Sequence, residues 1–113
     1  MVKTILITGA TDGIGKHLAK KLASEGHHVI LHGRNPQKLE FTLQEVRAVS
    51  LRGRVSSYLA DFSKLDDVYR FVEEIKRDFQ RIDILFNNAG LYAGKERKAS
   101  GENVELTFML SVL

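Results

Sequence analysis

Apolar residues along this chain fall into short β-rich runs, and longer amphipathic stretches separate each run from the next. The runs predict four strands, at residues 2–8, 29–31, 54–60 and 82–86. The first run is mostly apolar and ends at Gly9, which indicates a strand buried on both faces. Such strands are typical of a parallel sheet that is covered by helices on each side.

The first two amphipathic stretches have recognisable helix boundaries. From Ile14 to Glu25 the apolar positions recur at helical spacing, and Gly26 stands where a helix C-cap glycine is expected. Asn35 and Pro36 predict the start of a second helix, with an N-cap residue followed by proline at the first helical position. The apolar stripes of the two helices are Ile14, Leu18, Leu22 and Ala23, and then Leu39, Leu43 and Val46.

Two further helices follow the third and fourth strands. Ser63 and Asp66 form a capping-box-like start to a helix whose apolar stripe ends at Phe79. The paired acids Asp66 and Asp67 are interpreted as part of its solvent-exposed face. Residues 104–113 predict a last helix with almost no polar face, which should be buried or form an interface.

Strands that alternate with helices predict one α/β domain over residues 1–113, because 113 residues with 43% apolar content suit a single core. The expected fold is a Rossmann-like, doubly wound parallel sheet of four strands in the order 3-2-1-4, with helices on both faces. Ligands of such folds bind beyond the carboxyl ends of the strands.

Composition narrows the functional classes. The net charge of +3 comes from 17 basic and 14 acidic residues that are scattered along the chain, which argues against nucleic-acid binding. No cysteine is present, and no run is long enough for a secretion signal or a membrane span. We expect a cytoplasmic protein. His28 and His32 lie roughly 13 Å apart at about 3.3 Å per residue of strand, so with His27 they predict no metal site.

The segment from Thr8 to Gly15 carries the clearest chemistry, because its glycines lie between the first strand and the first helix. Gly9 allows a tight turn, Gly13 allows backbone to approach a pyrophosphate, and Gly15 permits close packing of helix on strand. The N–H groups at the helix start then face the phosphates. A P-loop is disfavoured, since His17 stands where that motif needs a hydroxyl residue after Lys16.

The Thr-Gly-x-x-x-Gly-x-Gly spacing of this segment resembles the short-chain dehydrogenase/reductase family. The family's second motif, Asn-Asn-Ala-Gly, is matched by residues 87–90. The resemblance covers essentially the whole chain and implies a fold that is incomplete relative to the family. It makes the following residues candidates for binding the dinucleotide: Gly9, Thr11, Asp12, Gly13, Ile14, Gly15, Asn87, Ala89 and Gly90.

The resemblance also assigns Asp61 and Phe62, after the third strand, to the adenine; a structural alternative is that Asp61 caps its loop. The second strand ends without the acid that binds the ribose hydroxyls of NAD, and Arg34 offers a fixed cation for a 2′-phosphate instead. Gly33 is expected to leave space beside the ribose. Asp12 opposes a nearby phosphate, but NADP is still favoured over NAD as the cofactor.

Hydride transfer to a carbonyl or from an alcohol substrate is the activity that the resemblance implies, through a serine and a Tyr-x-x-x-Lys motif. Four residues after Tyr58, Tyr69 and Tyr92 stand Phe62, Glu73 and Glu96, so this chain alone should be inactive. Ser111 occupies the position of a helix asparagine that many members carry. A non-catalytic nucleotide-binding or interaction protein is the alternative. Because residues 82–86 would form an exposed edge strand, we expect a homo-oligomer.

Overall fold

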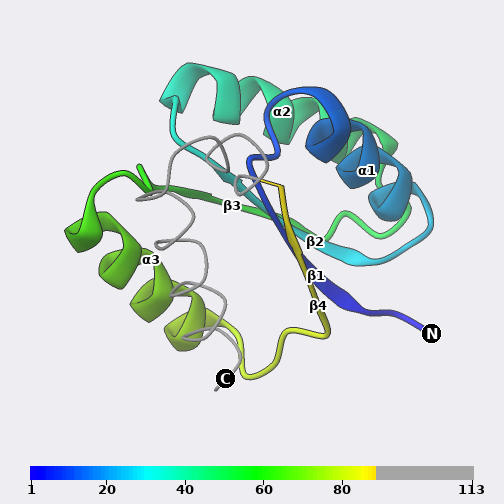
Figure 1. The fold of residues 1–113 in the computed structure, drawn as a ribbon. Helices are drawn as coiled ribbons and strands as arrows, with labels where there is room; N and C mark the ends of the chain where they lie inside the picture. Colours follow the sequence, from blue (N-terminus) through cyan, green and yellow to red (C-terminus); the bar gives the residue numbers. More distant parts are fainter. Residues whose placement is uncertain (89–113) are drawn as a thin grey trace.

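Four parallel strands form one sheet in the order β3-β2-β1-β4 in the computed structural model, which describes residues 1–88 (Figure 1). The strands are β1 (Thr4–Thr8), β2 (His28–Gly33), β3 (Val55–Leu59) and β4 (Ile84–Asn87). The predicted strand order is therefore confirmed, with boundaries that shift by at most two residues. The helix expected at 104–113 lies outside the described residues.

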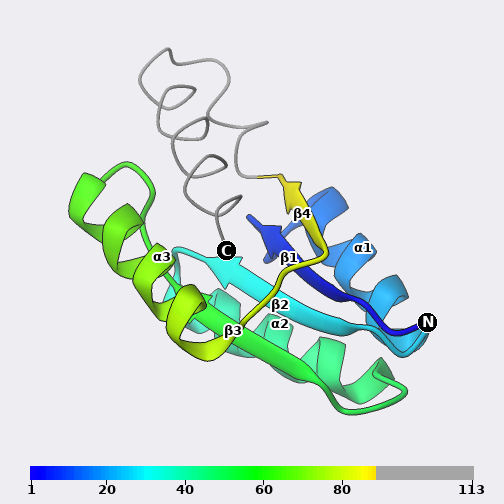
Figure 2. The same cartoon turned by 90° about the horizontal axis from the view of Figure 1, so that it is seen from below.

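Helices cover both faces of the sheet. α1 (Gly13–Ser24) and α2 (Pro36–Val49) lie on one face and α3 (Leu65–Asp78) lies on the other, as the two views show (Figures 1 and 2). This arrangement is the doubly wound α/β fold that the alternating pattern predicts. Each of β1, β2 and β3 is followed by a helix that returns the chain to the start of the next parallel strand.

The hydrophobic core consists of two clusters, one on each face of the sheet. In β1, Ile5 and Ile7 point toward α1 and α2, while Leu6 points toward α3. All three are at most 1% exposed, and burial of such a side chain contributes about 1.5–3 kcal/mol. The strand is apolar at successive positions because both of its faces are covered.

Two predicted helix boundaries are confirmed. The side chain of Asn35 accepts a 3.0 Å hydrogen bond from the backbone N–H of Lys38, and Pro36 is the first residue of α2. Gly26 follows the end of α1 with φ of 96°, a left-handed conformation that glycine adopts without strain. Both helix boundaries are thus determined by residues at the helix ends themselves, Asn35 and Gly26.

The predicted capping box of α3 is wrong. Lys64 is the N-cap residue, and it makes no side-chain capping bond. The Ser63 hydroxyl instead donates to Oδ1 of Asp61 at 2.7 Å, so it stabilises the loop that precedes the helix. An Asp two residues before a Ser offers a nearer acceptor than the helix N–H groups that a capping box would satisfy.

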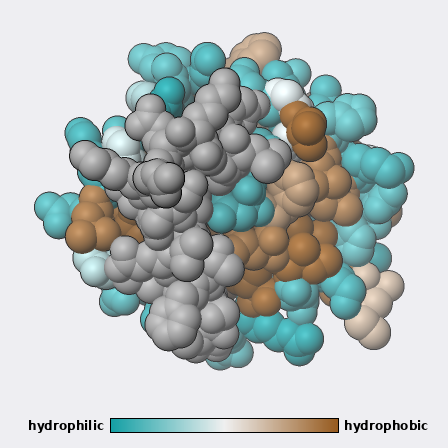
Figure 3. All heavy atoms as spheres, in the orientation of Figure 1, coloured by the Kyte–Doolittle hydropathy of each residue, from teal (hydrophilic) through white to brown (hydrophobic). Residues whose placement is uncertain are grey.

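The described surface is mostly polar but has apolar areas. Apolar side chains form a patch on the face of the molecule that Figure 3 shows, and polar side chains surround it. Ile84 of β4 is 45% exposed, and β4 pairs only with β1 within residues 1–88. No helix in this part of the chain is long and apolar enough to span a bilayer.

Candidate functional site

The carboxyl ends of the strands meet at one edge of the sheet. Figure 2 shows the arrowheads of β1, β2 and β4 on the same side, as the parallel registers require. The segments that follow these strands carry almost all of the residues predicted to bind a dinucleotide. Together with the Asp61–Phe62 segment after β3, the structure brings the glycine-rich turn at 9–15, Arg34 and Asn87 to this edge.

The glycine-rich turn has the backbone that the sequence predicts. Gly9 and Gly13 have φ of 62° and 56°, a region that non-glycine residues enter only with strain. Asp12 is the N-cap residue of α1, and its side chain makes no capping hydrogen bond. The first N–H groups of α1 lack intrahelical acceptors, so they remain suited to phosphate oxygens.

Gly15 lies in the tightest part of the turn. A Cβ atom at this position would lie 2.6 Å from the Gly9 carbonyl oxygen and 2.8 Å from Nδ2 of Asn88. Asn88 is buried, and its side-chain amide donates to the same Gly9 carbonyl at 2.9 Å. The absence of a side chain at Gly15 therefore lets α1, β1 and the end of β4 pack against one another, which confirms its predicted packing role.

Two neighbouring side chains also join β1 to β4. The Thr8 hydroxyl donates to Oδ1 of Asn87 at 2.8 Å. Together with the Asn88 bond, this contact fixes the start of the Asn-Asn-Ala-Gly segment beside the glycine-rich turn. Ala89 and Gly90 lie outside the described residues, as does Ser111.

Ile14 and Thr11 complete the turn. The predicted apolar stripe of α1 includes Ile14, but this residue is 64% exposed and contributes little to the core. Its position beside the first N–H groups of α1 places an apolar surface where a dinucleotide would lie. Thr11 packs inward, since its Cγ2 would lie 2.7 Å from a Cβ at Gly33.

That contact corrects the expectation for Gly33. The space at its Cα is filled by Thr11 and by the side chain of Leu39, whose Cδ1 would be 3.3 Å from a Cβ. Gly33 is thus required for packing of the turn against β2 and α2, and it does not leave open space for a ribose. An apolar methyl group and a core leucine supply the contacts there.

His32, the last residue before Gly33, forms the centre of the site although the sequence suggested no role for it. Its ring is 4% exposed. Nδ1 accepts a 2.9 Å hydrogen bond from the backbone N–H of Gly9, and Nε2 lies 2.9 Å from the Ala60 carbonyl oxygen. Because a carbonyl only accepts, Nε2 carries the proton and Nδ1 is the acceptor. Burial lowers the pKa of His32 to about 4, which keeps the ring neutral.

Phe62 stacks directly on this imidazole. The two ring centroids are 3.9 Å apart and the ring planes differ by 4°. Phe71 of α3 contacts both rings edge-on, at 5.3 Å from His32 and 5.1 Å from Phe62. Phe62, the candidate for contacting the adenine, is therefore held in place by ring contacts with His32 and with the buried Phe71.

Asp61 has the loop-capping contacts that the structural alternative predicts. Its Oδ1 accepts from both the N–H and the hydroxyl of Ser63, and these bonds lower the pKa of the Asp61 carboxyl below its usual value. Lys64 and Arg34 lower it further by their charge. The carboxylate is half-buried, charged and close to Arg34, so a capping role and a ligand-binding role are compatible.

Asp67 of the acidic pair on α3 is partly exposed and also makes a structural contact. Its Oδ2 accepts a 2.8 Å hydrogen bond from the backbone N–H of Asp61, and this bond lowers the pKa of the Asp67 carboxyl. One member of the pair thus anchors the loop that carries Asp61 and Phe62. Its position in the first turn of α3 directs the side chain back toward the loop.

Positively charged side chains lie beside the glycine-rich turn, at the end of β2 and the start of α2. Arg34 is exposed directly after β2. Lys38, from the first turn of α2, places Nζ 3.4 Å from Oδ2 of Asp12. The acid in the glycine-rich turn is therefore paired with a cation that the sequence reasoning did not identify. The sequence did contain a sign of this position for Lys38: residue 38 lies three residues after the predicted N-cap Asn35, and therefore in the first turn of the helix.

His27, His28 and His32 have separate hydrogen-bond partners. His27 accepts from the N–H of Lys3, and His28 lies 3.1 Å from the Ser56 hydroxyl through Nε2. Within residues 1–88 no group of three or more His, Asp or Glu residues is arranged to hold a metal ion. His27, His28 and His32 act in hydrogen bonding and packing.

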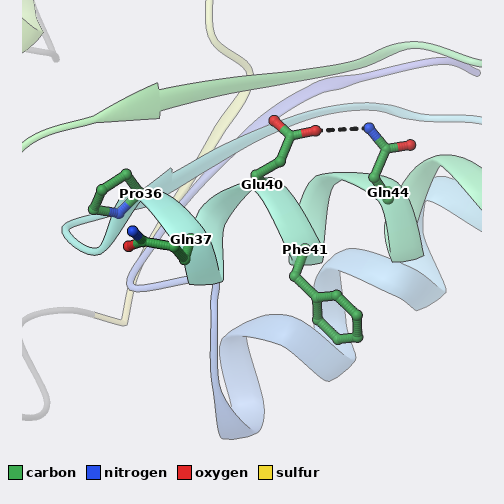
Figure 4. Close-up of a pocket in the computed structure, with 5 residues that line it drawn as sticks. All are labelled: Pro36, Gln37, Glu40, Phe41 and Gln44. Atoms are coloured by element: carbon green, nitrogen blue, oxygen red, sulfur yellow. Dashed lines mark hydrogen bonds between the residues drawn. The ribbon is translucent and has the colours of Figure 1, made fainter.

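A hollow of about 500 Å³ lies along exposed residues in the first three turns of α2. Figure 4 shows that its side chains do not converge: Glu40 and Gln44 bond to each other on one side, while Phe41 points toward α1. It contains none of the residues predicted to bind a cofactor. Its lining residues are Pro36, Gln37, Glu40, Phe41 and Gln44.

Comparison with known proteins agrees with this geometry. A family model described as short chain dehydrogenase matches residues 3–112. Retinol dehydrogenase 13 of Mus musculus is 37% identical over 89 residues, which make up 79% of this chain and 27% of that protein. The chain spans between 27% and 34% of the length of the curated relatives that it matches.

Solved structures share the fold. The oxidoreductase yciK from E. coli superposes with a TM-score of 0.77 at 29% identity, over 96% of this chain and 49% of that one. A metagenomic short-chain oxidoreductase in complex with NADP gives 0.65 at 32% identity, over 74% and 37%. An NAD+-bound xylitol dehydrogenase gives 0.65 at 36% identity, over 74% and 31%. The chain therefore belongs to the short-chain dehydrogenase/reductase family, to whose amino-terminal, dinucleotide-binding portion it corresponds.

Proposed function

We propose that this chain is the cofactor-binding portion of an NADP-dependent oxidoreductase that transfers a hydride between the nicotinamide and a carbonyl or alcohol substrate. The observation that supports it best is the charge beside the glycine-rich turn. Arg34 follows β2 in place of an acid, and Lys38 neutralises Asp12. A 2′-phosphate carries about two negative charges and needs fixed cations of this kind.

The residues present fit a dinucleotide. The turn at Gly9 and Gly13 exposes uncapped N–H groups for the pyrophosphate, and no Cβ fits at Gly15. Phe62 offers an aromatic edge and Asp61 a charged acceptor near the adenine position. Arg34 would hold the 2′-phosphate. When bound, the nicotinamide supplies the hydride or accepts it, and these residues orient the cofactor.

Isothermal titration calorimetry on the full chain tests the cofactor assignment. We expect NADPH to bind at least about tenfold more tightly than NADH, because a charge-assisted contact to a phosphate contributes roughly 1.5–3 kcal/mol. The preference should shrink as salt is raised from about 0.05 M to 0.5 M, since exposed charges are screened. Equal or tighter binding of NADH would contradict the proposal.

A non-catalytic nucleotide-binding protein is the second candidate, because none of the three tyrosines is followed four residues later by lysine. We propose that the 113 residues alone turn over no substrate. Consumption of NADPH with a panel of ketones and aldehydes checks this expectation. Turnover that persists after removal of contaminating enzymes would overturn it, and cofactor binding without turnover would support both this statement and the cofactor assignment.

Location and assembly are further parts of the proposal. The lack of cysteine in 113 residues fits a reducing compartment such as the cytoplasm, and the scattered charge gives no surface suited to nucleic acid. The apolar edge at Ile84 supports association with another copy of the chain. Light scattering at tens of micromolar measures the assembly, and a stable monomer would contradict it.

A further inference from the structure

Three strand ends are joined through one buried side chain, His32, which lies outside the two glycine-containing motifs at residues 8–15 and 87–90. His32 lies at the end of β2, and it is hydrogen-bonded to the backbone that follows β1 on one side and β3 on the other. Its backbone takes part as well, because the Ala10 N–H donates to the His32 carbonyl at 2.8 Å. The glycine-rich turn is thus bonded to this residue twice.

Chemistry explains why a histidine is suited to the position. The N–H of Gly9 needs an acceptor, the carbonyl of Ala60 needs a donor, and a neutral imidazole supplies one of each on opposite sides of a planar ring. The flat face of the same ring remains available, and Phe62 stacks on it at 3.9 Å. A leucine or phenylalanine would fill the volume but leave both buried backbone groups unpaired.

We propose that His32 is a positioning residue for the dinucleotide, which as the neutral Nε2–H tautomer clamps the phosphate-binding turn at Gly9 to the adenine-binding segment at Ala60–Phe62. This inference rests on the proposed cofactor binding and adds a residue to it. The ring touches no part of the ligand. It sets the distance between the two walls of the site and orients the Phe62 ring.

Four variants test the clamp in the full chain. His32→Phe keeps an aromatic ring for Phe62 but removes both hydrogen bonds. His32→Asn places an amide oxygen near the position of Nδ1, and so restores only the acceptor for Gly9. His28→Phe is the matched control, because His28 lies at the other end of β2, bonds through Nε2 to Ser56 and packs against Phe79. Val46→Ala removes core volume away from the site and controls for a general loss of stability.

The readouts are the Kd values for NADPH and for adenosine 2′,5′-bisphosphate. We expect His32→Phe to weaken both about tenfold or more, the effect of leaving buried backbone groups unpaired, and His32→Asn to recover part of the loss. His28→Phe and Val46→Ala should keep the Kd values of the parent chain even where their Tm falls. Unchanged Kd values in a folded His32→Phe chain would overturn the proposal.

Nitrogen-15 spectra of histidine-labelled parent protein provide a test that does not depend on whether a variant folds. We expect one histidine to be locked as the Nε2–H tautomer at pH 7, with its Nδ1 coupled across a hydrogen bond to the Gly9 amide. A His32 ring that is protonated at Nδ1, or that exchanges freely between tautomers, would overturn the clamp. If the parent chain binds neither NADPH nor NADH while this signature is present, the proposed function fails and the structural clamp stands.

Discussion

Lys38 and Asp12 form an ion pair across the mouth of the glycine-rich turn, with Nζ and Oδ2 3.4 Å apart. Both side chains are more than half exposed, so the pair contributes at most about 1 kcal/mol to stability. Its main effect is on the local charge. The acid that would repel a phosphate is partly neutralised, and the lysine is held where it can also approach an anion.

Removing the acid should therefore improve NADPH binding. Asp12→Asn is expected to lower the Kd for NADPH about two- to fivefold, because it frees Lys38 and removes a negative charge near the phosphates. Lys38→Ala should raise the Kd by a similar factor. Calorimetry at low and high salt separates the effect from a change in fold, since only a charge effect is screened. An increase of the NADPH Kd in Asp12→Asn would contradict this account.

Arg34→Ala should weaken NADPH binding about ten- to a hundredfold and leave NADH binding nearly unchanged. The guanidinium follows β2 at the carboxyl edge of the sheet, where the adenosine ribose is proposed to lie. Arg52→Ala is the control, because Arg52 is an exposed arginine in the loop before β3, at the opposite edge. Equal losses for the two cofactors would show that Arg34 serves folding instead.

Gly15→Ala should destabilise the fold by about 1–3 kcal/mol, although alanine has the higher helix propensity. The new Cβ would collide with the Gly9 carbonyl oxygen and with Asn88, both of which are fixed by hydrogen bonds. Chemical denaturation measures the loss. Gly53→Asn is the comparison, since nothing lies within 4 Å of a Cβ there and asparagine enters the φ of 71° with less strain than most other side chains. A Gly15→Ala chain as stable as the Gly53→Asn chain would refute the packing argument.

Stability should fall with acid in a window set by His32. Its pKa is 6.5 in the unfolded chain and about 4 in the folded one, where burial favours the neutral ring despite the Asp61 carboxylate nearby. The unfolded state therefore binds the proton first as the pH decreases. The free energy of unfolding should drop by about 3 kcal/mol between pH 6.5 and pH 4, and the drop should be complete below pH 4.

Urea denaturation across this range measures the effect, and His32→Asn isolates it because asparagine does not titrate. Asp61, Arg34 and Lys64 carry the charges around the site, and they remain in the variant. The pKa of His28 is also lowered by burial, so His28→Phe is the second control. The His32 contribution is refuted if His32→Asn loses as much stability between pH 6.5 and pH 4 as the parent chain.

The sequence was sufficient to predict the architecture, because the spacing of apolar residues shows which faces of each strand and helix are buried. The run Ile5, Leu6 and Ile7 predicts two-sided burial, and the structure confirms it. Asn35 and Gly26 act on residues three or four positions away, so their capping roles can be deduced locally. Ser63 shows the limit of this reasoning, because two local acceptors competed and the Asp61 carboxylate was preferred to the helix N–H groups.

The contacts within the site could not be deduced in the same way. His32 and Gly9 are 23 residues apart, and His32 and Ala60 are 28 residues apart, so their bonds depend on the register of three strands. Gly33 was interpreted as free space because the sequence does not reveal that the Thr11 methyl group fills it. The hydrogen bond from the Asp61 N–H to Asp67 could not be deduced either, because it depends on the direction in which α3 leaves the preceding loop.

The bond from Asn88 to the Gly9 carbonyl has a consequence for biogenesis, because the two residues are 79 positions apart in the chain. On a ribosome the glycine-rich turn emerges early, yet β1 has no partner on its β4 side until nearly the whole described segment has been made. Contacts of such long sequence separation form late and slow the folding of a domain. The nascent chain therefore carries an exposed strand edge for most of its synthesis, and a dinucleotide that selects the finished turn would stabilise the product only after β4 has joined the sheet.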